Sequence, residues 1–166
     1  MANITLGGTP VETADELPAV ESQAPDFTVT KSDLSDTSLS EYKGKNVVLN
    51  IFPSIGTGVC QASVRKFNEL AAGKENTVVI GVSRDLPFAH HQFCEAEGIE
   101  NVIPTSEYKN TSFSNNYPVK YLNGKFEGLL SRSIVVIDPS GTITYTEQVP
   151  ETGQEPDYDK ALAAIG

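Results

Sequence analysis

The stretch "NVVLNIFPSIGTGVC", Asn46–Cys60, organises the chain, because a buried strand passes there directly into a helix. Five of the seven residues in "NVVLNIF" are apolar and scarcely alternate with polar ones, as in strands covered on both faces. From Gly58 to Gly73 the spacing is helical, which predicts a helix of about four turns with Cys60 in its first turn. The predicted buried face of this helix consists of Val59, Ser63, Phe67, Leu70 and Ala71.

Downstream of this helix, strands and helices continue to alternate. "TVVIGVS", Thr77–Ser83, predicts a second buried strand, and residues 85–98 predict a second helix that carries Cys94. We expect Asp85 to cap this helix and Gly98 to end it. "NVIPTS" then predicts a third strand and "SFSNNYP" a short helix.

Each end of the chain carries a hairpin signal. "SIVVID" and "TITYTEQV" flank the turn "PSG", and "NITLGGTPVET" surrounds a Gly-Gly-Thr-Pro turn. With a closing helix in "PDYDKALAAI", the elements predict a thioredoxin-like α/β fold: a mixed β-sheet flanked by helices on both faces, with an N-terminal β-hairpin. We expect residues 1–166 to form a single domain, because 166 residues fit one hydrophobic core.

The charge balance limits the classes of partner. Twelve basic and 22 acidic residues give a net charge of −10, which argues against binding to nucleic acid or to an anionic membrane. The N-terminal sequence lacks the basic start and apolar run of a signal peptide, and no later segment is long enough to span a bilayer. We therefore expect a cytoplasmic protein.

The chain has two cysteines, Cys60 and Cys94. Their separation excludes a CxxC redox motif, and two sulfurs are too few for a structural four-cysteine zinc site. In a reducing cytosol a static disulfide is not expected, so a functional thiol, a metal ligand and simple packing remain open.

The position of Cys60 favours a reactive thiol. An ordinary thiol, with a pKa of about 8.5, is only roughly 3% thiolate at pH 7. Free N–H groups and the macrodipole at the start of a helix favour the anion. Thr57 can offer a hydroxyl to the sulfur or to a bound oxygen, and Pro53 can shield the turn from water.

The sequence from Pro53 to Cys60 resembles the PxxxTxxC motif of the peroxiredoxins. "ASVRKFNE", "SRDLPFAHHQFC", "SRSIVVID" and the N-terminal "ITLGGTPV" are similar to their thiol peroxidase branch, in the same order along the chain. The resemblance implies a hydroperoxide substrate, thioredoxin as the reductant, a homodimer, and neither cofactor nor metal. Gly56 departs from the pattern, because relatives often carry an acidic residue there.

The same resemblance implies the roles of individual residues. Cys60 is expected to be the peroxidatic cysteine and Cys94 the resolving cysteine, which together form an intramolecular disulfide. Arg132 and Thr57 complete the expected catalytic set. The expected substrate-binding residues are Pro53, Ser54 and Val59.

Thiolate formation alone does not account for an efficient peroxidase. Complete ionisation of the thiol gains only ~30-fold in rate, so donors must stabilise the transition state. Arg132, the Thr57 hydroxyl and the Cys60 N–H are expected to hold the two peroxide oxygens as charge moves between them.

Other functions remain as alternatives. His90, His91 and Cys94 could serve a metal-binding module, although neighbouring helical histidines point about 100° apart and no fourth ligand is evident. A redox-inert thioredoxin-like interaction domain would leave Cys60 no more reactive than a free thiol. A site like that of glutathione peroxidases would require a tryptophan, and the chain has none.

Overall fold

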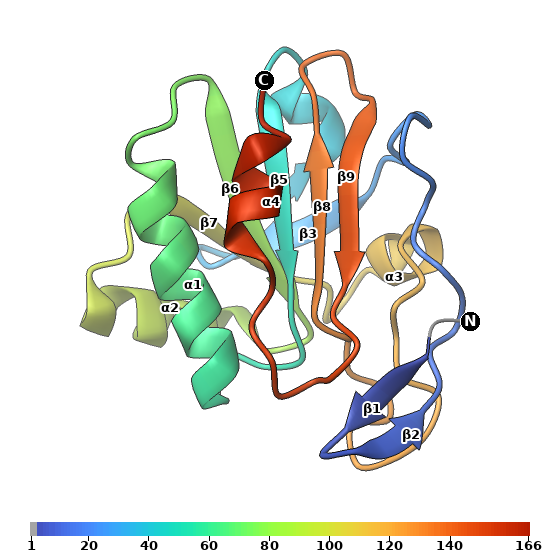
Figure 1. Ribbon diagram of the computed structural model, residues 1–166. Helices are drawn as coiled ribbons and strands as arrows, with labels where there is room; N and C mark the ends of the chain where they lie inside the picture. The colour runs from blue at the N-terminus through green and yellow to red at the C-terminus, as the bar shows by residue number, and fades with distance from the viewer. Residues whose placement is uncertain (1–2) are drawn as a thin grey trace.

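A seven-stranded mixed sheet forms the centre of the computed structural model, which describes residues 3–166 (Figure 1). Its strands are β3 (Thr28–Lys31), β4 (Asp36–Ser38), β5 (Asn46–Ile51), β6 (Thr77–Ser83), β7 (Val102–Ser106), β8 (Ser133–Ile137) and β9 (Ile143–Gln148). Their spatial order is β4-β3-β7-β6-β5-β8-β9. The mixed sheet predicted from the sequence is confirmed.

Strand β5 lies inside the sheet and every residue in it is buried. It pairs in parallel with β6 and antiparallel with β8, so both of its edges are hydrogen bonded. Its apolar side chains enter the cores on both faces, which explains why the sequence shows a nearly continuous apolar run.

Helices cover both faces of the sheet (Figure 1). Helices α1 (Gly58–Ala71) and α4 (Tyr158–Ala163) pack on one face, where Phe67 meets Tyr158 edge to face. Helix α2 (Pro87–Glu97) lies beside α1. The short α3 (Ser112–Asn116) packs on the opposite face, and the 3-10 helix η1 (Leu39–Tyr42) leads into β5.

An aromatic cluster closes the face that α3 covers. The rings of Phe113 and Tyr117 stack with their centroids 4.9 Å apart, and Phe27 packs edge-on against both. All three side chains are buried against the apolar residues of β5, β6 and β8. Short as it is, α3 is therefore held by packing rather than by its own helical stability.

The N-terminal hairpin consists of β1 (Ile4–Leu6) and β2 (Thr9–Val11), as predicted. The hairpin is hydrogen bonded to the loop that follows β9. The Thr5 N–H donates to the Pro150 carbonyl at 2.7 Å, and the Thr152 N–H donates to the Thr5 carbonyl at 2.9 Å. Within residues 3–166, no helix is long and apolar enough to cross a membrane.

Two local predictions were wrong. Asp85 does not cap α2, because its carboxylate is bound to the loop between β5 and α1, and the N-cap residue Leu86 offers no side-chain bond. The buried face of α1 comprises Cys60, Ser63, Val64 and Phe67, a rotation of the predicted stripe that leaves Val59 half-exposed.

We expect Phe113→Ala to lower the free energy of unfolding by about 3 to 5 kcal/mol, because it empties a fully buried ring site between two other rings. Urea denaturation of the reduced protein measures the change. Tyr108→Ala is the control, since Tyr108 is 40% exposed and its loss should change the free energy of unfolding little. Equal effects of the two substitutions would contradict the packing role of Phe113.

Candidate active site

Cys60 lies in the first turn of α1, where Thr57 is the N-cap residue. The Thr57 hydroxyl oxygen accepts the Cys60 N–H at 3.3 Å and its hydroxyl group donates to the Ser54 carbonyl at 3.3 Å. The Cys60 N–H, expected to face a substrate oxygen, is thus engaged in the cap. The Cys60 side chain is fully buried and packs against Phe52 and Val64.

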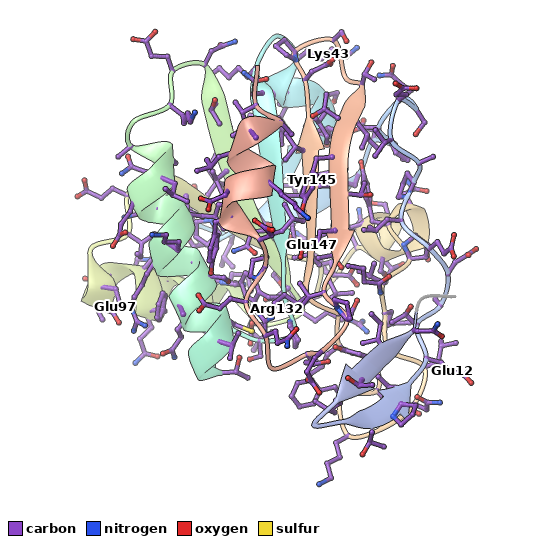
Figure 2. All side chains as sticks on the ribbon, in the orientation of Figure 1. Glu12, Lys43, Glu97, Arg132, Tyr145 and Glu147 are labelled. Carbon is purple, nitrogen blue, oxygen red and sulfur yellow. The ribbon has the colours of Figure 1, made fainter. Side chains whose placement is uncertain are left out.

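Arg132 approaches the sulfur from the start of β8 (Figure 2). Its Nη1 donates to Cys60 Sγ at 3.4 Å. Its Nε and Nη2 both donate to the Thr152 carbonyl, at 3.3 and 3.0 Å. Two N–H groups on one carbonyl fix the plane of the guanidinium, so Nη1 is aimed at the sulfur.

The charge of Arg132 has no carboxylate counterion. The side chain is 2% exposed, and among residues 3–166 no carboxylate forms an ion pair with it. An unpaired buried charge costs several kcal/mol, and an anion at Cys60 Sγ would offset part of that cost. The site therefore places a buried positive charge without a carboxylate partner next to the Cys60 sulfur.

A surface pocket of about 330 Å³ leads to the guanidinium. Thr57, Val59 and Thr152 line it beside Arg132, and Leu6 of the hairpin and Phe126 add apolar walls. Of the residues expected to bind substrate, Val59 lies in this pocket. Pro53 is buried and the Ser54 hydroxyl donates to Asp85, so neither lines it, and their role in substrate binding stays a prediction.

Cys94 lies on α2 and is half-buried, and both cysteines are free thiols on different helices. Burial raises the pKa of the Cys94 thiol to about 11. Cys94 therefore stays protonated near neutral pH while α2 is folded.

The two histidines beside Cys94 have different surroundings. His90 is buried against Ser83, whereas His91 pairs with Glu95 at the surface. In the part of the chain that the structure describes, no three His, Cys, Asp or Glu side chains are grouped to hold a metal ion.

Sequence reasoning missed the residues that support Arg132. Thr152 acts through its backbone carbonyl, which has no side-chain signature, and its hydroxyl forms a 2.6 Å hydrogen bond with the Tyr121 hydroxyl. The prediction for Asp85 was wrong because an Asp before a helix is the usual cap signal. Only the fold shows that two donors from the loop before α1, Ser54 and Ile55, bind its carboxylate together with the nearby Ser83.

Comparisons with known proteins agree with this geometry. The model of the Redoxin family matches residues 19–162. The chain is 53% identical to a thiol peroxidase of Mycobacterium tuberculosis over 166 residues, which cover all of this chain and 99% of that protein. The chain belongs to the thiol peroxidase family of redoxins. A thiol peroxidase of Corynebacterium glutamicum is 46% identical over 165 residues, 99% of each chain.

Solved structures of this family share the fold. A peroxiredoxin-like protein from Aquifex aeolicus superposes with a TM-score of 0.91 at 35% identity, over 97% of this chain and 94% of that one. A thiol peroxidase from Chromobacterium violaceum reaches a TM-score of 0.89 at 16% identity, over 97% and 93% of the two chains. The thioredoxin-like arrangement predicted from the sequence is thereby confirmed.

We expect Cys94 in a Cys60→Ser variant to react with iodoacetamide about 100-fold more slowly in the folded protein than in urea, because burial suppresses its thiolate. The native rate should rise with pH toward about 11, the pKa to which burial raises this thiol. Mass spectrometry of quenched samples measures the rate. A native profile with its midpoint at the pH found in urea would contradict the burial effect.

Proposed function

We propose that the protein is a thiol-dependent peroxidase that reduces hydrogen peroxide and organic hydroperoxides, with Cys60 as the peroxidatic residue. The observation that carries this proposal is the contact between the buried guanidinium of Arg132, which has no carboxylate partner among residues 3–166, and the Cys60 sulfur. Membership of the thiol peroxidase family supports the same reaction.

In the first step the Cys60 thiolate attacks one oxygen of a hydroperoxide that has entered through the pocket beside Thr57 and Val59. The O–O bond breaks, and its electron pair leaves with the distal oxygen, which takes up a proton and departs as water or an alcohol. Cys60 becomes a sulfenic acid.

Donors at the site stabilise the charge that moves during this attack. Arg132 Nη1 is already aimed at the sulfur and can shift to the oxygen beside it. The hydroxyl of Thr57 makes only a long bond to the Ser54 carbonyl, which it can exchange for a peroxide oxygen. Both donors lie in the pocket before substrate arrives, so little reorganisation is needed.

In the second step Cys94 condenses with the sulfenic acid, which gives the Cys60–Cys94 disulfide and releases water. Both thiols are free in the folded chain and Cys60 is fully buried, so we expect local unwinding to bring the two sulfurs together. Unwinding of α2 also exposes Cys94, which lowers its pKa from about 11 toward the ordinary value and so makes it a better nucleophile. The Cys94 thiol is therefore protonated and weakly nucleophilic in the folded protein, and it becomes reactive only when α2 unwinds.

The family relationship supports thioredoxin as the reductant of this disulfide, a homodimeric assembly and a cytoplasmic location. Two large apolar side chains at the start of α2, Leu86 and Phe88, are 53% and 63% exposed and offer a contact surface for a second protein chain. The apolar pocket walls formed by Leu6 and Phe126 suit organic hydroperoxides as well as hydrogen peroxide.

Peroxide consumption with thioredoxin, thioredoxin reductase and NADPH tests the proposal. We expect Cys60→Ser to abolish consumption, because it removes the nucleophile. We expect Cys94→Ser to consume one equivalent and then to stop at the sulfenic acid, which a dimedone adduct reveals by mass. Loss of the first turnover in Cys94→Ser would remove Cys94 from the resolving role, and an active Cys60→Ser would refute the proposal.

We expect Arg132→Lys to lower the rate constant of the first step by about 10² to 10³, the usual effect of losing a transition-state donor. A lysine ammonium cannot bind the Thr152 carbonyl twice and still point one N–H at the sulfur. Single-turnover peroxide loss measures the rate. Arg65→Lys is the control, since Arg65 is exposed and pairs with Glu97 instead of contacting Cys60. An unchanged rate in Arg132→Lys would contradict the donor role.

A further inference from the structure

Asp85 links the loop before Cys60 to the segment before Cys94. Its Oδ2 accepts the Ile55 N–H at 2.7 Å and its Oδ1 accepts the Ser54 hydroxyl at 2.7 Å. Its Oδ2 also accepts the Ser83 hydroxyl at 2.6 Å. Hydrogen bonds of this length to a carboxylate are charge-assisted and roughly twice as strong as neutral ones.

Ser83 extends this connection into α2. The Ser83 hydroxyl has one proton, which it donates to Asp85, so at its 2.8 Å contact with His90 Nε2 the serine oxygen accepts. Burial lowers the pKa of His90 more than Asp85 raises it, so the ring is neutral and carries its proton on Nε2. His90 lies one helical turn before Cys94.

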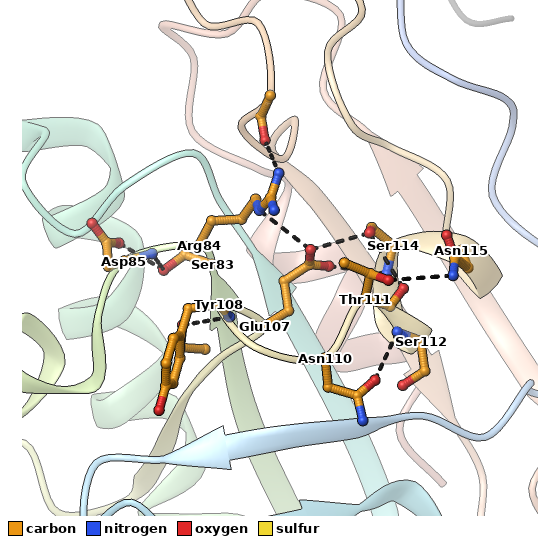
Figure 3. Close-up of polar contacts among 12 residues, drawn as sticks. Ser83, Arg84, Asp85, Glu107, Tyr108, Asn110, Thr111, Ser112, Ser114 and Asn115 are labelled. Atoms are coloured by element: carbon orange, nitrogen blue, oxygen red, sulfur yellow. Dashed lines mark hydrogen bonds and ion pairs between the residues drawn. The ribbon is translucent and has the colours of Figure 1, made fainter.

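The residue next to Asp85 is held from the other side (Figure 3). Arg84 pairs with the buried Glu107 at 3.4 Å and donates to the Gly128 carbonyl at 2.8 Å. Glu107 in turn accepts the N–H and the hydroxyl of Ser114 on α3. The loop from Ser83 to Asp85 is therefore a fixed support, to which the Cys60 loop and α2 are attached.

The beginning of helix α2 has no side-chain cap, and there Pro87 is buried and the His90 ring packs edge-on against Phe52. Its N-cap residue, Leu86, has no polar side-chain atom to cap the helix, and the neighbouring carboxylate of Asp85 is turned toward Ser54 and Ile55. A helix start without a side-chain cap leaves N–H groups for water and frays readily. The bonds from Ser83 to His90 and Asp85 therefore restrain this end of α2.

We propose that Asp85 is a positioning residue that connects the Cys60 loop to the Cys94 helix, and that breaking this connection limits the rate of disulfide closure. We call the connection, made by the hydrogen bonds of Asp85 and Ser83 to Ser54, Ile55 and His90, the clasp. The inference rests on the proposed function, in which the Cys60 sulfenic acid and the Cys94 thiol form a disulfide and water. Unwinding that joins the two sulfurs pulls Ser54, Ile55 and His90 away from the support. The clasp thus holds the site in its peroxide-reactive form.

Asp85→Asn tests the clasp, because the amide cannot accept all three donors. Reduced protein is mixed with one equivalent of hydrogen peroxide, quenched in acid at successive times and analysed by mass for sulfenic acid and disulfide. Acid quenching suits this chain, since it has no tryptophan to report fluorescence changes. We expect disulfide closure to be at least ~10-fold faster than in the wild type, the effect of losing about one charge-assisted bond.

Two further variants separate the clasp from a general loss of stability. Ser83→Ala keeps the bonds from Asp85 to the Cys60 loop but cuts the link to His90, and it should also speed closure. Asp138→Asn is the matched control, because Asp138 likewise accepts three donors, from Ser140 and Thr142, in the turn between β8 and β9. It should leave the closure rate unchanged even where it lowers the free energy of unfolding.

The amount of sulfinic acid formed at high peroxide is a second measurement, because disulfide closure and a second peroxide compete for the sulfenic acid of Cys60. A second peroxide oxidises the sulfenic acid to a sulfinic acid only while Cys60 remains in its folded site, so faster opening should protect it. Asp85→Asn should therefore require several-fold more peroxide for half-maximal sulfinic acid, whereas Asp138→Asn should match the wild type.

The outcomes are distinct. Closure at the wild-type rate or slower in Asp85→Asn, or equal acceleration in Asp138→Asn, would overturn the clasp while the wild type still consumes peroxide. A wild type that consumes no peroxide would instead overturn the proposed function, and the clasp with it.

Discussion

The site depends on one constraint: a buried positive charge must be held still beside a sulfur atom. Arg132 donates two N–H groups, from Nε and Nη2, to the Thr152 carbonyl, and this orientation directs Nη1 at Cys60. Carbonyl and thiol partners satisfy its hydrogen bonds but do not neutralise its charge. A buried charge of this kind is costly to leave uncompensated, and the Cys60 sulfur is the side-chain atom that faces it.

The register of the sheet and the contacts of the loop after β9 together bring Arg132 to the Cys60 sulfur. In the antiparallel pair of β5 and β8, Ile51 lies opposite Ser133, which places Arg132 beside the loop that leads into α1. The N-terminal hairpin then holds the loop after β9, where Thr152 lies, through backbone bonds at Thr5. A hairpin at the edge of the molecule thus supports the acceptor that orients the arginine, and its Leu6 also lines the pocket.

The proposed reaction makes opposite demands on Cys60, because peroxide attack needs a rigid site and disulfide closure needs a local rearrangement. Polar bonds are suited to both demands. They are directional enough to position the Cys60 loop, yet exchanging each of them for water costs only about 1.5 to 3 kcal/mol, so the segment can still open. The apolar core of the sheet can remain closed while the Asp85 connections break, so opening stays local.

The sequence by itself determined the order of strands and helices, the placement of Cys60 in a first helical turn and the likeness to thiol peroxidases. These follow from local features: apolar runs in β5 and β6, helical spacing after Gly58 and turn residues in the hairpins. Only the tertiary structure decided which donors face the Cys60 sulfur, that Thr152 orients Arg132, and that Asp85 binds the Cys60 loop instead of capping α2. The physical reason is separation along the sequence, because periodicity and capping signals involve residues within one or two helical turns of each other. Bonds such as that from Arg132 to Cys60 join residues 72 positions apart and exist only once the sheet has set their distance.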